Sequence, residues 1–296
     1  MTIEEYRKLN CLEAYLKLEE AVVLKKPFSL IRLGDGEGAL MGYPYVTDRE
    51  AVDRSFKVWF GNTSISDSEA IDIASRIREA VRNSDLVGLP RKKQLDRHPY
   101  YQAVYSSIDY YQLNESQMYT DAAIHRYLQF CLLFRKLLKG QDYLGVITPR
   151  TICAELKSAF GVKKVERFAI RGETRFSGDE STPHYPDAFN TITETISPPF
   201  KGAIFLVGAG GLGKIYCDVI KQRGGIAIDI GALFDAWAGI KSRLVHPSHS
   251  INCYQETPIV SAEKAFERFN ALCDHFSLDT EQLSLNQFPE FKGASW

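Results

Sequence analysis

The sequence lacks the features that mark several large classes of protein. Its six cysteines are widely scattered and no two of them stand in a C-x-x-C spacing, so a zinc knuckle is not indicated. No apolar run approaches the roughly 20 residues that a membrane-spanning helix needs. The formal net charge is only −1, which gives no sign of the basic excess that is typical of nucleic-acid binding.

These absences indicate where the protein works. The N-terminus runs directly into a charged, amphipathic segment and has no pattern of a secretory signal. We therefore expect a cytoplasmic protein with reduced thiols, because disulfides persist mainly outside the reducing cytoplasm. Nucleic-acid partners and transmembrane segments are not expected, whereas peripheral membrane association stays open.

The residues that are present describe a folded chain. Hydrophobic residues make up 45% and charged residues 25% of the 296 positions, the usual profile of a globular protein. Short apolar runs predict strands at 28–33, 85–89, 143–148, 165–170, 203–207 and 226–230. Helical spacing predicts helices at 3–25, 66–83, 152–160, 213–223 and 262–276, two more within 100–138, and a loop over 172–187.

Strands that alternate with helices indicate an α/β fold. The expected architecture is a mostly parallel sheet with helices on both faces. The chain contains no linker-like stretch and no repeat, so we predict a single domain over residues 1–296. Because ligands of such sheets bind beyond the carboxyl ends of the strands, the residues that follow each strand are the candidate site.

An acidic segment follows the first predicted strand. Asp35 and Glu37 stand one residue apart, with Gly36 between them and Gly34 in front, which predicts a tight acidic turn. Hard divalent cations prefer carboxylate oxygens, and glycine lets a ligand approach the backbone closely. The segment is therefore a candidate metal site. A solvated turn is the alternative, because Asp and Gly are both common turn residues.

A glycine-rich segment follows the fifth predicted strand. Gly208, Gly210 and Gly213 form a G-x-G-x-x-G pattern between a strand and a helix, with Gly211 as a further glycine inside it, and Asp229 closes the next strand. This context is typical of a site that holds phosphate groups at a helix N-terminus. The same glycines would equally serve a tight turn that needs small residues for packing.

Three charged residues near the other strand ends complete the candidate site. Arg32 lies within the first strand, and either forms an ion pair, with Asp35 as the candidate partner, or holds a phosphate. Arg171 and Glu173 follow the fourth strand. A mixture of carboxylates, cations and bare glycine backbone is what a diphosphate with a bridging metal requires.

The segment Phe28–Glu37, with the sequence FSLIRLGDGE, resembles the opening motif of the GT-D glycosyltransferases. A second resemblance covers residues 202–231, where a strand, a glycine-rich turn and a helix lead to a strand that ends in Asp-Ile-Gly. The two blocks bracket about 200 residues in the expected order. Between them the chain matches the family only in its rhythm of strands and helices, and its G-x-G-x-x-G departs from what the family leads one to expect.

The resemblance implies a Rossmann-like fold and a metal-dependent sugar transfer in bacterial surface-polysaccharide or glycoprotein biosynthesis. The donor would be a nucleoside-diphosphate sugar, most often a UDP-sugar, and the acceptor a glycan or glycolipid. Asp35 and Glu37 would serve Mn²⁺ or Mg²⁺ and the chemistry itself. The alternative is an NAD(P)-dependent oxidoreductase that uses residues 208–213 and Asp229, and a third reading is a nucleotide-binding module without catalysis.

Overall fold

The structure is a computed structural model of the whole chain. It describes residues 8–61, 64–114, 116–173 and 180–242, together with the single residues 6, 176, 178, 251, 254, 261, 263, 264 and 267.

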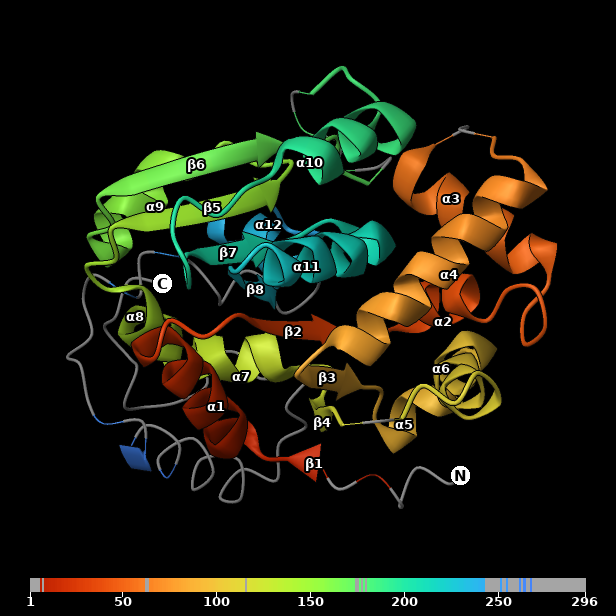
Figure 1. Ribbon diagram of the computed structural model, residues 1–296, viewed down its shortest axis with the longest axis horizontal. Coiled ribbons are helices and arrows are strands. Elements are labelled where there is room, and N and C mark those ends of the chain that lie inside the picture. The colour runs from red at the N-terminus through yellow and green to blue at the C-terminus, as the bar shows by residue number, and fades with distance from the viewer. Residues whose placement is uncertain are drawn as a thin grey trace.

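One sheet of eight parallel strands organises the described residues. Its order is β1-β4-β3-β2-β8-β7-β5-β6, and every neighbouring pair is parallel. Figure 1 shows this order from β6 at the top to β1 at the bottom. The strands are β1 (Lys8–Leu9), β2 (Phe28–Arg32), β3 (Leu86–Leu89), β4 (Met118–Asp121), β5 (Tyr143–Thr148), β6 (Lys164–Ala169), β7 (Ile204–Val207) and β8 (Ile226–Asp229). The predicted α/β fold is confirmed, and the sheet is parallel throughout.

Alternating side chains give the sheet two buried faces. In β7, Ile204 and Leu206 belong to one core cluster, whereas Phe205 and Val207 belong to the other. A strand with apolar residues on both sides reads as a continuous apolar run, which is why the central strands were visible in the sequence.

Helices cover both faces of the sheet. The first core cluster is closed by α1 (Cys11–Val23), α7 (Ile124–Phe130), α8 (Leu133–Leu138), α9 (Cys153–Phe160) and α12 (Leu233–Trp237). The second is closed by α2 (Asp35–Met41), α3 (Arg49–Phe60), α4 (Asp67–Asn83), α6 (Pro99–Tyr110), α10 (Phe189–Thr195) and α11 (Gly213–Gln222). Shorter elements are α5 (Lys92–Leu95), η2 (His184–Ala188) and η3 (Gly210–Leu212).

The direction of the chain reverses between β5 and β7. From β5 the chain crosses through α9 to β6, toward one edge of the sheet. From β7 it crosses through α11 to β8, toward the other edge and over the opposite face. Loops that leave adjacent strands toward opposite faces open a crevice between them, and this is where open α/β sheets bind their ligands.

The sequence-based assignment was wrong at four places. The helix predicted over 3–25 is preceded by β1 and begins only after Asn10, whose side chain accepts the Glu13 amide. The region 100–138, predicted as two helices, contains β4. The helices α2 and α3 were not predicted, and part of the loop over 172–187 forms η2. Of the predicted helix 262–276 only residues 263, 264 and 267 are described, and these are helical.

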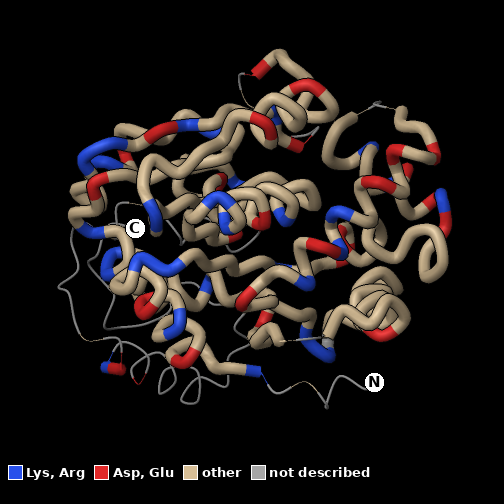
Figure 2. Tube along the Cα trace, viewed as in Figure 1, with Lys and Arg blue, Asp and Glu red and all other residues tan. Residues whose placement is uncertain are grey.

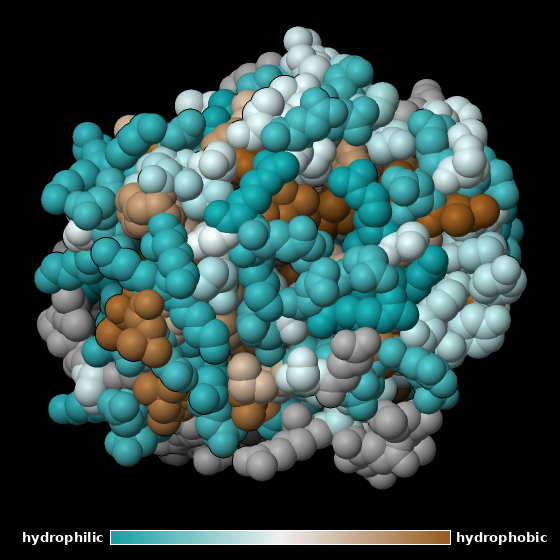
Figure 3. Space-filling view, viewed as in Figure 1, coloured by the Kyte–Doolittle hydropathy of each residue, from teal (hydrophilic) through white to brown (hydrophobic). Residues whose placement is uncertain are grey.

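The charged and the apolar residues of the described chain are distributed over several parts of the molecule (Figure 2 and Figure 3). Acidic and basic residues are interspersed along the described trace in Figure 2. Apolar residues form small separate areas on the face shown in Figure 3. None of the described helices combines the length and the apolarity required to cross a bilayer.

Candidate functional site

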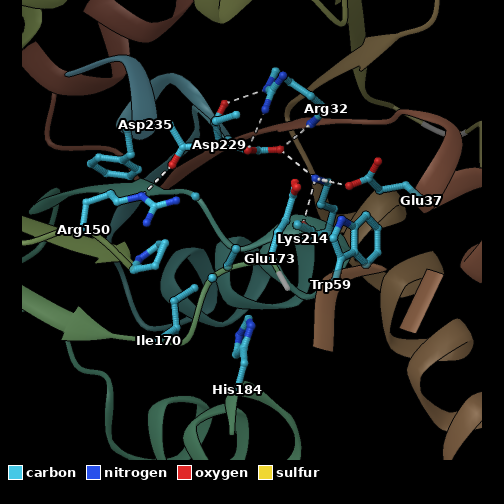
Figure 4. Close-up of a pocket in the computed structure, with 18 of the residues that line it drawn as sticks. Arg32, Glu37, Trp59, Arg150, Ile170, Glu173, His184, Lys214, Asp229 and Asp235 are labelled. Carbon is cyan, nitrogen blue, oxygen red and sulfur yellow. Dashed lines mark hydrogen bonds and ion pairs between the residues drawn. The ribbon is translucent and has the colours of Figure 1, made fainter. Parts of the chain in front are cut away.

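A cavity of about 260 Å³ lies at the carboxyl ends of the strands. Its walls come from the segments after β2, β5, β6, β7 and β8, because parallel strands place all these ends at one edge (Figure 4). Of the residues predicted from the sequence, the cavity is lined by Arg32, Asp35, Glu37, Arg171, Glu173, Gly208, Gly210 and Asp229. The predicted Gly34, Gly36, Gly211 and Gly213 are not part of the lining.

A buried lysine joins the acidic segment to the end of β8. The Lys214 ammonium lies 2.6 Å from Glu37 Oε1 and 2.9 Å from Asp229 Oδ2, and it donates to the Gly210 carbonyl at 3.2 Å. An ammonium group has three N–H donors, so all three are matched by protein acceptors. Burial alone would lower the pKa of Lys214, but the carboxylates of Asp229 and Glu37 raise it above the usual value.

Asp229 is held from the other side by Arg32. Arg32 donates from Nη2 to Asp229 Oδ1 at 3.1 Å and from Nε to the Asp229 carbonyl at 3.0 Å. Burial would raise the pKa of Asp229, yet Arg32 and Lys214 together hold it below the usual value. Arg32 is therefore part of an ion pair, as one of the two interpretations of the sequence had it, but its partner is Asp229 and not Asp35.

The Nη1 nitrogen of Arg32 also has protein partners. It lies 3.3 Å from the Ala122 carbonyl and 3.0 Å from His125 Nδ1. Arg32 thus fixes the loop after β4 against the end of β8.

Asp35 and Glu37 open a helix instead of forming the predicted turn. Gly34 is the residue before α2, and Glu37 Oε2 accepts its amide at 2.8 Å, so the glutamate caps the helix. Glu37 is buried, with 8% of its surface exposed. Asp35 is exposed at the cavity and makes no hydrogen bond or ion pair with the described residues. The two carboxylates therefore have different environments.

The opposite wall of the cavity carries Arg150, which the sequence did not single out as a site residue. Its Nε donates to Asp235 Oδ1 at 2.7 Å, and only 5% of the residue is exposed. Figure 4 shows Arg150 and Asp235 on one side of the cavity and Glu37 on the other. Arg171 is exposed in the same cavity, and Glu173 is half-buried beside it.

The glycine-rich turn is packed against Trp59. A Cβ on Gly36 would meet the indole at 2.4 Å, one on Gly211 at 2.5 Å and one on Gly210 at 3.2 Å. The turn is a short 3-10 helix, and the Gly213 amide donates to the Ala209 carbonyl. Close packing against Trp59 therefore explains why glycine stands at these positions.

Aromatic residues close the cavity on the side of η2. His184 is buried, its Nε2 lies 3.1 Å from the Tyr216 hydroxyl, and its ring packs edge-on against Phe60 at 5.1 Å. Burial lowers the pKa of His184 to about 3, so the imidazole is neutral near pH 7. A neutral aromatic wall thus faces a charged one.

The described residues offer few donors for a metal ion. No three His, Cys, Asp or Glu side chains within this part of the chain lie close enough to hold one by themselves. Glu37 has both oxygens engaged, by Lys214 and by the Gly34 amide. Asp35 remains as an exposed carboxylate, which suits an ion whose other ligands are water and substrate oxygens.

Comparison with known proteins identifies the family. A family profile described as a GT-D fold-like domain matches residues 9–237, which is most of the chain. The chain therefore belongs to the GT-D-like family and has a glycosyltransferase-type α/β fold. No curated protein matches it.

The solved structures that match this chain have low sequence identity to it. One is described as the highly conserved domain of unknown function 1792 with a distinct glycosyltransferase fold. It is 19% identical, with 88% of this chain and 94% of that chain covered and a TM-score of 0.48. A second, described as a new glycosyltransferase from Streptococcus sanguinis, is 18% identical over 84% of this chain and 95% of that chain, with a TM-score of 0.45.

Proposed function

We propose that the protein is a glycosyltransferase that uses a nucleoside-diphosphate sugar as donor. The observation that carries the proposal is the cavity at the reversal between β5 and β7, which places guanidinium groups opposite an exposed carboxylate. Membership of the GT-D-like family supports sugar transfer as the reaction. By the same resemblance, the donor is a UDP-sugar and the acceptor a glycan or glycolipid of bacterial surface-polysaccharide or glycoprotein biosynthesis.

The charge of the cavity supports a requirement for Mn²⁺ or Mg²⁺. Among the described lining residues five are basic and five are acidic, so the wall is close to neutral. A diphosphate would add two or three negative charges that these residues do not balance. The residues present fit a divalent cation that Asp35 shares with the phosphate oxygens, because magnesium sites commonly use only one or two carboxylates.

Different residues of the cavity have different roles in the proposed reaction. The bound cation would neutralise charge that develops on the departing nucleoside diphosphate. Asp35 holds the cation, and Glu37 fixes the start of α2 and the position of Lys214. Arg150 and Arg171 attract the phosphates from the other wall, and Trp59, Phe60 and His184 exclude water from the neighbouring surface.

The structure does not favour the oxidoreductase alternative. In a dinucleotide site the acidic residue at the end of the second strand binds a ribose hydroxyl, but Asp229 is 2% exposed and both of its oxygens are held by Arg32 and Lys214. Trp59 also covers the glycine turn where the pyrophosphate would lie.

A turnover assay with a panel of nucleotide sugars tests the proposal. We expect nucleoside-diphosphate release from one donor in the presence of Mn²⁺ or Mg²⁺, and its loss in EDTA with recovery when metal is added back. NAD(P) should not change the melting temperature. Tight NAD binding that is indifferent to EDTA, with no donor consumed, would reject the glycosyltransferase and support the oxidoreductase.

A further inference from the structure

Three cations that line the cavity differ in how many of their donors the protein uses. Lys214 donates to Glu37, Asp229 and Gly210 and has no N–H group left. Arg32 has partners for Nε, Nη1 and Nη2. Arg150 differs, since its Nε donates to Asp235 but its two terminal nitrogens have no hydrogen-bond partner among the described residues.

A buried guanidinium group with unpaired N–H donors destabilises the fold unless a ligand accepts hydrogen bonds from it. Arg150 is 5% exposed and therefore has little water around it, and a buried donor without a partner lowers the stability of the fold. The two terminal nitrogens of Arg150 are not fully enclosed by the protein. Because Arg150 lines the cavity, the surface that these nitrogens still expose faces the cavity. Asp235 holds Nε, which fixes the direction of the remaining fork.

The chemistry of this fork selects an oxyanion. Two parallel N–H groups of a planar guanidinium match two oxygens of a phosphate or carboxylate group. Two amides of the glycine-rich segment are not available to a phosphate, because the Gly208 amide donates to the Ile147 carbonyl and the Gly213 amide to the Ala209 carbonyl. Arg150 is also the second residue after β5, at the strand reversal where α/β sheets bind their ligands.

We propose that Arg150 is the phosphate-binding residue of this cavity, and that it grips the diphosphate of the donor through its terminal nitrogens while Asp235 holds it in place. The claim that the bound group is the diphosphate of a sugar donor rests on the proposed function. The claim that Arg150 binds a phosphate group does not. Arg150 therefore acts on binding of the diphosphate, and Asp235 is a positioning residue.

Calorimetry with inorganic pyrophosphate, UDP and uridine, each with and without Mn²⁺, tests this site. Arg150→Lys keeps a positive charge opposite Asp235 and so protects the fold, but it loses the two-pronged geometry. We expect pyrophosphate and UDP to bind about 10- to 100-fold more weakly to this variant, the range for loss of hydrogen bonds to a charged group. Uridine binding should not change.

Two further variants separate ligand binding from a structural role. Asp235→Asn keeps an acceptor for Nε and removes a negative charge beside the phosphate, so pyrophosphate should bind equally or more tightly. Arg78→Gln removes a half-buried guanidinium that donates to the Met41 and Tyr43 carbonyls outside the cavity, and it should leave pyrophosphate affinity unchanged.

The outcomes distinguish this proposal from the proposed function. Unchanged pyrophosphate and UDP affinity in Arg150→Lys, or no binding of either by the native protein, would overturn the phosphate site even if sugar transfer is observed. Pyrophosphate binding that depends on Arg150, in a protein that consumes no nucleotide sugar, would keep the phosphate site and reject the glycosyltransferase.

Discussion

Asp35 and Glu37 are close neighbours in the sequence, yet their surroundings assign them different tasks. Asp35 faces the cavity without a hydrogen bond to the described residues, whereas Glu37 is buried against Lys214 and the Gly34 amide. A cation approaching Glu37 would meet the ammonium of Lys214 on the same carboxylate. The direct metal contact is therefore expected at Asp35.

This difference predicts opposite behaviour of two conservative variants. Asp35→Asn should lower turnover by roughly 10²–10³-fold, because it removes a charge that supports the leaving group, and should leave the melting temperature unchanged. Glu37→Gln should lower the free energy of unfolding by up to about 3 kcal/mol, since it breaks one of the two buried ion pairs of Lys214.

Metal titrations and melting curves on the same preparations check both expectations, and Glu50→Gln, an exposed position on α3, serves as the control. If Asp35→Asn turns over at the native rate with an unaltered metal requirement, Asp35 is not the metal ligand.

His184 makes stability depend on pH. Its pKa is about 3 in the folded protein because the ring is fully buried, and an exposed histidine has a pKa near 6.5. The unfolded chain therefore binds a proton more readily between these values, and the folded state loses stability as the pH falls through this window.

We expect His184→Gln to reduce the loss of unfolding free energy between pH 6.5 and pH 4.5 by about 2 kcal/mol. Glutamine can still reach the Tyr216 hydroxyl, which limits the loss at neutral pH. Urea unfolding at several pH values measures the slope; identical slopes in the two proteins would show that His184 is charged in the folded state.

The sequence predicted which residues lie at the site better than it predicted which of them pair with one another. It placed Asp35, Arg171, Gly208 and Asp229 at strand ends, and the structure brings all four to one cavity. Lys214 and Arg150 also follow predicted strands, but the sequence did not select them for the site because their partners are remote: Lys214 and Glu37 are 177 positions apart in the chain. Such pairs follow from strand order, which composition and periodicity do not specify.

At the scale of elements, the central strands were predictable and the short edge strand β1 was not. β2, β5, β7 and β8 are buried on both sides and stand out as apolar runs. β1 has two residues, and β4 is a four-residue strand within a helical region. α2 was read as a turn because Gly36 and Gly38 have low helix propensity, whereas tertiary packing and the Glu37 cap stabilise it.

The N-terminus of helix α4 shows how much a capping residue contributes to the stability of the fold. Ser66 Oγ accepts the Glu69 amide at 3.3 Å, and Glu69 Oε2 accepts the Ser66 amide at 2.7 Å. Ser66→Ala should lower the free energy of unfolding by about 1 kcal/mol, because it leaves the first turn with an unpaired donor. Ser75→Ala, at an exposed position within the same helix, should have no such effect, and denaturant unfolding compares the two. Equal stabilities would mean that water replaces the cap.

At the scale of the molecule, the sheet gathers residues that lie far apart along the chain. The cavity takes one wall from β2 and the segment after it, and another from the segments after β5 and β6. This convergence was predictable because all strands of a parallel sheet end at one edge. The size of the cavity and its balance of charge depend on side-chain packing and became visible only in the structure.

The indole of Trp59 touches both the start of α2 and the glycine-rich turn while it lines the cavity, and this gives the protein a built-in optical reporter. Its emission should shift when a nucleoside diphosphate displaces water from the cavity. Trp237, by contrast, is buried against Phe134 and hydrogen-bonded to Gln129. Its emission should therefore not change. The shift should vanish in Trp59→Phe and persist in Trp237→Phe, so that ligand binding can be followed by fluorescence in real time without any label.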